Sequence, residues 1–157
     1  MPELRAALET AGFRDVRTYV QSGNVLLTST SSPQDVATQV NALIKDRFGF
    51  DVVVLVRSRD ELAQIVERNP LRAIAVQPKA HLVTFLSGEL PRELIDRLSG
   101  LVTHEQFEVV GREIYSWHPA GFAHSPLWER LAAKSLGVAA TSRNWTTVTT
   151  LLAMAAE

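Results

Sequence analysis

The sequence contains no cysteine among its 157 residues. This absence excludes disulfide bonds, thiolate nucleophiles and cysteine-ligated metals, and it fits a reducing compartment. No apolar run approaches the ~20 residues that a membrane-spanning helix needs, and the opening residues MPELR lack the basic and apolar parts of a signal peptide. We therefore expect a cytoplasmic protein that does not enter a membrane.

The sequence also lacks a strong charge of either sign. It has 16 Lys and Arg residues against 17 Asp and Glu residues, which gives a formal net charge of -1 at pH 7. No basic field is therefore present to attract nucleic acid or an anionic membrane, and we do not expect nucleic-acid binding. The hydrophobic share of 46% and the charged share of 21% are those of an ordinary globular protein.

Motifs of common catalytic and metal sites are absent as well. The chain has no Gly-x-Ser-x-Gly nucleophile motif, no Gly-x-Gly-x-x-Gly loop and no Walker-type phosphate loop. His118 and His124 are six residues apart across a loop, without an HExxH motif or a carboxylate cluster beside them. His81 falls in an expected strand, which favours a structural histidine. We expect neither a metal site nor a cofactor.

Helix and strand patterns fill the first 70 residues. Apolar spacing predicts helices over residues 3–10, 33–48 and 59–67, of which the last two follow the capping residues Ser32 and Ser58. Alternation predicts a hairpin of residues 16–21 and 24–28 around a two-residue Ser22-Gly23 loop, which would pair Tyr19 with Leu26. Residues 52–56 are a continuous apolar run, which indicates a strand covered on both faces.

The remaining residues repeat the mixture of helices and strands. Strands are expected over residues 80–86, 106–110 and 113–117, and helices over residues 90–101, from Ser125-Pro126 through Leu136, and from Thr141 onward. The order of these elements predicts an α+β protein of two halves with antiparallel sheets, residues 1–70 and residues 71–157.

The polar stretch 141–148, TSRNWTTV, is the strongest candidate for a site. Thr141 precedes an apolar stripe at helical spacing and would cap the last helix, which places Arg143 in the first turn. A cation is disfavoured at this end of a helix unless a negative group lies beside it. That group is either a carboxylate of the same chain or a bound anion, and the sequence leaves both open.

Two segments of the chain resemble a known family. The segments 19–24, YVQSGN, and 141–148, TSRNWTTV, are similar in sequence, order and separation to signatures of the bacterial domain of unknown function 1697 family. The resemblance extends over nearly the whole chain. It implies a cytosolic bacterial protein built of two ferredoxin-like α+β subdomains, and it implies no reaction.

One departure from the family pattern concerns the first sheet. Family members usually open with a strand and a glycine-containing loop ahead of the helix that begins here at Pro2. In a ferredoxin-like sheet that strand is central, so residues 52–56 would lose a neighbour and expose an apolar edge. We expect that another segment fills the gap, that a second chain pairs there in a homodimer, or that the natural start lies upstream.

These observations give one main functional hypothesis and two alternatives. The main hypothesis is a binding module that holds a small anionic or nucleotide-like ligand in the cleft between the halves. Its candidate residues are Tyr19, Gln21, Ser22, Asn24, Thr141, Arg143 and Asn144. The first alternative is a protein-interaction or structural domain that uses an exposed sheet edge. The second is an enzyme at the same cleft with Tyr19 or Tyr115 as a proton donor. The polar hairpin residues also fit an ordinary solvated strand face, the more common arrangement for such residues.

Overall fold

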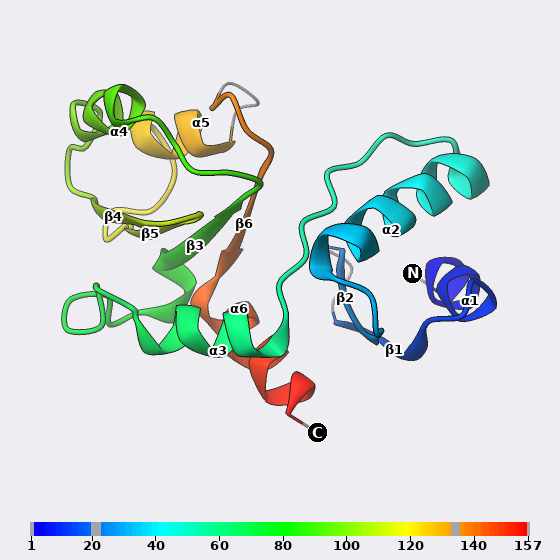
Figure 1. Cartoon of the computed structure of the whole chain (residues 1–157). Helices are drawn as coiled ribbons and strands as arrows, with labels where there is room; N and C mark the ends of the chain where they lie inside the picture. The colour runs from blue at the N-terminus through cyan, green and yellow to red at the C-terminus, as the bar shows by residue number, and fades with distance from the viewer. Residues whose placement is uncertain (1, 20–22, 133–135, 157) are drawn as a thin grey trace.

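The chain folds as an α+β protein with two separate antiparallel sheets. The structure is a computed structural model, and it describes residues 2–19, 23–132 and 136–156. The N-terminal part comprises α1 (Pro2–Thr10), β1 (Arg14–Tyr19), β2 (Asn24–Thr28) and α2 (Pro33–Phe48). The C-terminal part runs from α3 to α6, and Figure 1 shows the two parts side by side, joined by an extended segment.

The C-terminal part is built on a four-stranded sheet. Its elements are α3 (Arg59–Glu67), β3 (His81–Leu86), α4 (Arg92–Ser99), β4 (Gln106–Val110), β5 (Glu113–Trp117), α5 (Pro126–Ala132), β6 (Ala140–Asn144) and α6 (Trp145–Ala155), with a 3-10 turn at Pro78–Ala80. The strand order β4-β5-β3-β6, with every neighbour antiparallel, is the ferredoxin-like arrangement. All residues of the central strand β3 are buried.

Helices cover both faces of this sheet, as Figure 1 shows. On one face Leu98 of α4 and Leu127 of α5 pack with Leu86 and Ile114 of the sheet. On the other face α3 and α6 cover the sheet, and the buried residues there are Ile65, Leu71, Val83, Phe85, Tyr115 and Val148. Strand β3 is buried on both sides although it includes the polar residues His81 and Thr84.

The N-terminal part has a smaller core. Leu8 of α1, Phe13, Val16 of β1 and Val36 of α2 form its buried cluster. Helix α2 has the ends predicted for it, because Ser32 accepts a hydrogen bond from the backbone N–H of Asp35 and Gly49 ends the helix with φ +76°. The two-stranded hairpin is a small sheet, and such a sheet depends on helix packing for its stability.

The expectation of a strand at residues 52–56 is wrong. Residues 51–58 form no strand, and Val53 is 49% exposed. Among the described residues no strand pairs with this segment, and a strand without a pairing neighbour has no partner for its backbone N–H and C=O groups. Side-chain donors reach two of its carbonyls instead: Asn41 Nδ2 lies 2.9 Å from Val52 O, and Arg57 Nη1 lies 3.1 Å from Val56 O.

Several contacts between described residues link the two parts. The connecting segment divides its side chains between the cores, since Leu55 packs in the C-terminal part and Val56 in the N-terminal part. Arg17 of β1 donates a 2.7 Å hydrogen bond to the carbonyl of Met154 in α6. Arg143 of β6 contacts the hairpin, as described below. No helix in the described residues has the length and apolar character to cross a membrane.

Candidate functional site

The polar stretch 141–148 is part strand and part helix. Residues Ala140–Asn144 form β6, which pairs antiparallel with β3, and α6 begins at Trp145. The expectation that Thr141 caps the last helix is therefore wrong. Asn144 is the N-cap, with an extended backbone (ψ 164°) and a side chain that accepts from the backbone N–H of Thr147. Residues 140–144 form a strand instead of the start of a helix because they pair with β3 and so cover an edge of this buried strand.

Arg143 lies in the strand, opposite Val83, and not in a helical first turn. Its Nε donates a 2.7 Å hydrogen bond to Oδ1 of Asn24, which is 119 residues away in the sequence. Its Nη1 donates to Oγ1 of Thr141 at 2.7 Å and to the carbonyl of Ser142 at 2.8 Å. Burial lowers the pKa of the Arg143 guanidinium from its ordinary value. The recorded acceptors are neutral, and they fix the orientation of a partly desolvated cation.

The tip of the hairpin supplies the other side of this contact. Asn24 is 6% exposed, and its Nδ2 donates to the carbonyl of Tyr19 at 3.1 Å. A Cβ added to Gly23, which has φ +86°, would lie 4.0 Å from Nη2 of Arg143, so Gly23 lies close to the guanidinium. The structure thus brings Asn24, Thr141 and Arg143 together.

The hairpin register differs from the expected one. Tyr19 pairs with Asn24, where a two-residue loop would have paired it with Leu26, and the ladder is irregular between Arg14 and Arg17. The pairing is therefore shifted by two residues from the expected register, and Asp15 takes φ +51° near the irregularity. Tyr19 is half-buried on β1. The predicted site residues Gln21 and Ser22 lie outside the described residues.

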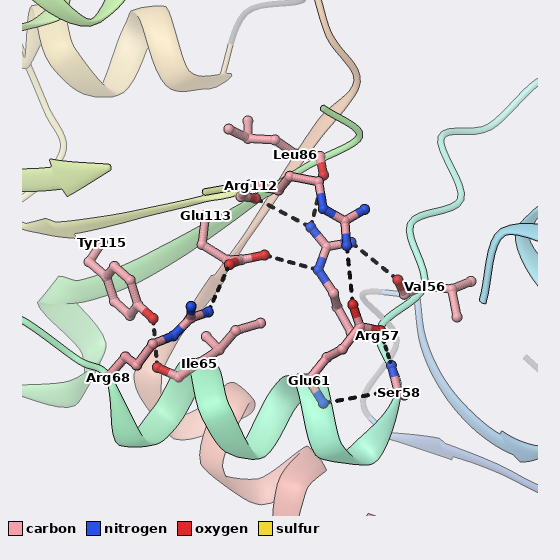
Figure 2. A network of polar contacts seen from close by, with 10 residues as sticks. All are labelled: Val56, Arg57, Ser58, Glu61, Ile65, Arg68, Leu86, Arg112, Glu113 and Tyr115. Atoms are coloured by element: carbon pink, nitrogen blue, oxygen red, sulfur yellow. Dashed lines mark hydrogen bonds and ion pairs between the residues drawn. The ribbon is translucent and has the colours of Figure 1, made fainter. Parts of the chain in front are cut away.

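A second polar cluster lies at the end of the C-terminal sheet, and no sequence pattern had indicated it as a unit. Arg57 has a side chain only 7% exposed, and its Nε lies 3.0 Å from Oε2 of Glu113, itself 6% exposed. Arg57 Nη2 donates to the carbonyls of Leu86 at 2.8 Å and of Arg112 at 3.3 Å. Figure 2 shows Arg68 reaching Glu113 from the opposite side.

The start of α3 joins this cluster. Ser58 and Glu61 form a capping box, in which each side chain accepts from the other residue's backbone N–H. The other carboxylate oxygen of Glu61 lies 3.1 Å from Arg112. The Ser58–Glu61 spacing was visible in the sequence and predicts the helix start. The partner of Arg57 was not, because Glu113 is 56 residues away.

Tyr115 is unsuited to the proton-donor role considered for it. Its side chain is fully buried, and its hydroxyl donates a 2.6 Å hydrogen bond to the carbonyl of Ile65 in α3. Burial raises the pKa of Tyr115 to about 12. The residue fastens α3 to the sheet, and only Tyr19 remains of the two candidate tyrosines.

Two histidines are buried in the C-terminal part. His81 stacks on Trp145 with ring centroids 4.6 Å apart, and its Nε2 has no hydrogen-bond partner. His118 Nε2 lies 2.8 Å from Oγ of Ser116, while its Nδ1 is unpartnered. Burial lowers the pKa of both imidazoles, that of His81 to about 4. Among residues 2–19, 23–132 and 136–156, no group of three or more His, Asp or Glu side chains could hold a metal ion.

Comparisons with known proteins place the chain in a family. A solved structure, that of the conserved bacterial protein SP0830 from Streptococcus pneumoniae, matches with a TM-score of 0.76 and 20% sequence identity over 99% of this chain and 88% of that one. This likeness shows a shared fold. No curated protein matches. The family model described as "Protein of unknown function (DUF1697)" matches residues 1–115, and the chain therefore belongs to the DUF1697 family.

Proposed function

We propose that the protein is a binding module for a small anionic or nucleotide-like ligand, held where the tip of the β1–β2 hairpin meets β6. The observation that carries the proposal is the contact between Asn24 and Arg143. It places two polar segments from opposite ends of the chain in one cluster, around a guanidinium whose orientation is fixed by three acceptors. Preorganised arginine is well suited to bind phosphate and carboxylate groups.

The electrostatics of the cluster support an anion in particular. Burial disfavours the charged form of Arg143, and the acceptors on Asn24, Thr141 and Ser142 hold its guanidinium in one orientation. An anion placed against this guanidinium would offset part of the cost of its desolvation. The amide of Asn24 and the hydroxyl of Thr141 add groups that can form hydrogen bonds with polar atoms of a ligand.

A ligand screen with matched variants tests this proposal. Thermal unfolding is followed with nucleotides, sugar phosphates and simple anions for the parent, Arg143→Ala and Arg17→Ala. Arg17→Ala is the control, because it also removes an arginine contact between the two parts and leaves Arg143 in place. A compound that stabilises the parent and Arg17→Ala, but not Arg143→Ala, is the expected result. An equal shift in Arg143→Ala would exclude this residue from the site.

A second candidate function, self-association, is favoured by a different observation. Phe50, Val52 and Val53 are 62%, 37% and 49% exposed, and they follow one another along an extended segment that joins no sheet. An open apolar edge of this kind invites pairing with another strand. We propose a second copy of this chain as the partner.

Mass measurement by light scattering across a range of concentrations tests the second candidate. Val53→Lys should reduce association, because a lysine in the contact would have to lose its hydration. Ile74→Lys is the control, since Ile74 is another exposed apolar residue, at 38%, away from the segment. A parent that stays monomeric at every concentration excludes this candidate.

A further inference from the structure

A pocket of about 280 Å³ opens between α3 and the β4–β5 turn, apart from the Arg143 cluster. Helix α3 supplies one wall together with Arg57 ahead of it and Arg68 just after it, and β5 and the β4–β5 turn supply the other. Glu89, between β3 and α4, also lines the pocket. Charged side chains dominate the lining, namely Arg57, Glu61, Arg68, Glu89, Arg112 and Glu113. The volume is near the lower end of the range for small-molecule sites, roughly 300–1,000 Å³.

The deepest charges in this pocket neutralise each other. Arg57 and Glu113 are both more than nine-tenths buried and lie 3.0 Å apart. The remaining donors of Arg57 go to main-chain carbonyls, those of Val56, Leu86 and Arg112. These contacts hold the Arg57 side chain in one orientation. It is therefore part of the wall, not a group that could move toward a ligand.

The formal charges at the mouth also balance, with Glu61 and Glu89 against Arg68 and Arg112, but Arg68 is held less closely than Arg112. Glu61 is shared between Arg112 and the backbone N–H of Ser58. Arg68 lies 3.6 Å from Oε1 of Glu113, beyond hydrogen-bond distance, and that carboxylate already neutralises Arg57. Two arginines thus surround one buried carboxylate, and the side chain of Arg68 is 49% exposed. Figure 2 shows the guanidinium of Arg68 at the edge of the cluster.

We propose that this pocket binds a small oxyanion, a phosphate or carboxylate group, with Arg68 as its principal contact. An oxyanion there supplies the hydrogen-bond acceptors that the 3.6 Å ion pair does not, and a guanidinium can meet two oxygens at once. Arg112 adds attraction from the turn. Gln64, exposed on the same helix, offers an amide N–H to the ligand.

The pocket also contains a residue that should oppose such a ligand. Glu89 lines it with an exposed side chain, and its charge would repel an anion. Removing this charge should strengthen anion binding, whereas it would weaken the binding of a cation. Whether removal of the Glu89 charge strengthens or weakens binding therefore distinguishes an anion site from a cation site.

Titration with inorganic phosphate, at constant ionic strength set with sodium chloride, provides the test. The thermal midpoint of the parent should rise by about 3–6 °C once phosphate exceeds its dissociation constant tenfold. The rise should vanish in Arg68→Gln and should occur at lower phosphate concentration in Glu89→Gln. Arg92→Gln is the matched control, because Arg92 is an exposed helical arginine in an ion pair on α4, and it should behave as the parent does.

The same titration separates this site from the one at Arg143. A rise that survives in Arg143→Ala and is lost in Arg68→Gln supports the pocket, while the reverse pattern overturns it and supports the Arg143 cluster. A rise that persists in both variants, or no rise at all in the parent, overturns the proposal. Weaker phosphate binding in Glu89→Gln also overturns it.

Discussion

The two parts of the molecule are built from similar helices and strands, but their sheets differ in the number of paired strands. The C-terminal part has four paired strands and helices on both faces, and its central strand is wholly buried. The N-terminal part has two paired strands and an extended apolar segment that joins no sheet. The difference shows that apolar sequence alone does not make a strand. Residues 52–56 are as hydrophobic as β3, yet only β3 has neighbours on both sides.

The largest test of this contrast removes a buried charge from the C-terminal part. Glu113→Ala leaves Arg57 buried without its carboxylate, so the free energy of unfolding should fall by about 3–5 kcal/mol. Urea denaturation provides the measurement. The control is Glu9→Ala, which breaks the half-exposed Arg5–Glu9 pair of α1 and should cost less than about 0.5 kcal/mol. Equal effects of the two changes would contradict the distinction between the parts.

Acidification should weaken the C-terminal part, because both buried histidines lie there. The folded-state pKa of His81 is about 4, against 6.5 for the free side chain, so the unfolded chain binds more protons between these values. Stability should therefore fall as the pH decreases from 6.5 toward 4, by on the order of 3 kcal/mol. Denaturation midpoints at pH 7.5 and pH 4.5 measure this loss.

Two variants assign the pH effect. His81→Phe keeps an aromatic ring against Trp145 and removes the titrating group, so its stability should depend less on pH than that of the parent. His104→Gln changes an exposed histidine and should retain the full dependence. A pH dependence that is identical in His81→Phe and the parent would show that other groups cause the loss.

The smallest test compares one helix cap in each part. Asn144→Ala and Ser32→Ala each remove a side chain that accepts from the first turn of a helix, so each should cost about 1 kcal/mol. Tryptophan fluorescence reports the C-terminal part, because Trp117, Trp128 and Trp145 all lie there. If the parts unfold separately, only Asn144→Ala should shift the fluorescence midpoint. A matching shift in Ser32→Ala would show that they unfold together.

The features that sequence could predict are those decided by nearby residues. The ends of α2 and α3 follow from Ser32, Gly49 and the Ser58–Glu61 capping box, each within one helical turn of its partner. The hairpin of β4 and β5 and the α+β class follow from alternation and element order. The family resemblance was confirmed by the matching family model.

The features that escaped prediction depend on distant neighbours. The stretch beginning at Thr141 became a strand because β3 had an edge to cover, and β3 is more than 50 residues away. The Arg57–Glu113 pair joins residues 56 apart, which no local pattern encodes. For the candidate site, the sequence indicated Asn24 and Arg143 as residues of one cleft between the halves, without a direct contact between them. That their side chains touch depends on how the two parts pack, and this packing leaves no periodic signal in the sequence.

The contacts of Arg57 with the C-terminal sheet set the length of the segment that connects the two parts. Helix α2 ends at Gly49, and Arg57 is bound to the end of the C-terminal sheet, so only residues 50–56 can change shape between two fixed points. Seven residues can span at most roughly 25 Å when fully extended. The hydrogen bond from Asn41 to the carbonyl of Val52 shortens the part of this segment that is free to move. The connecting segment therefore limits how far the N-terminal part can move away from Arg143 and the C-terminal part.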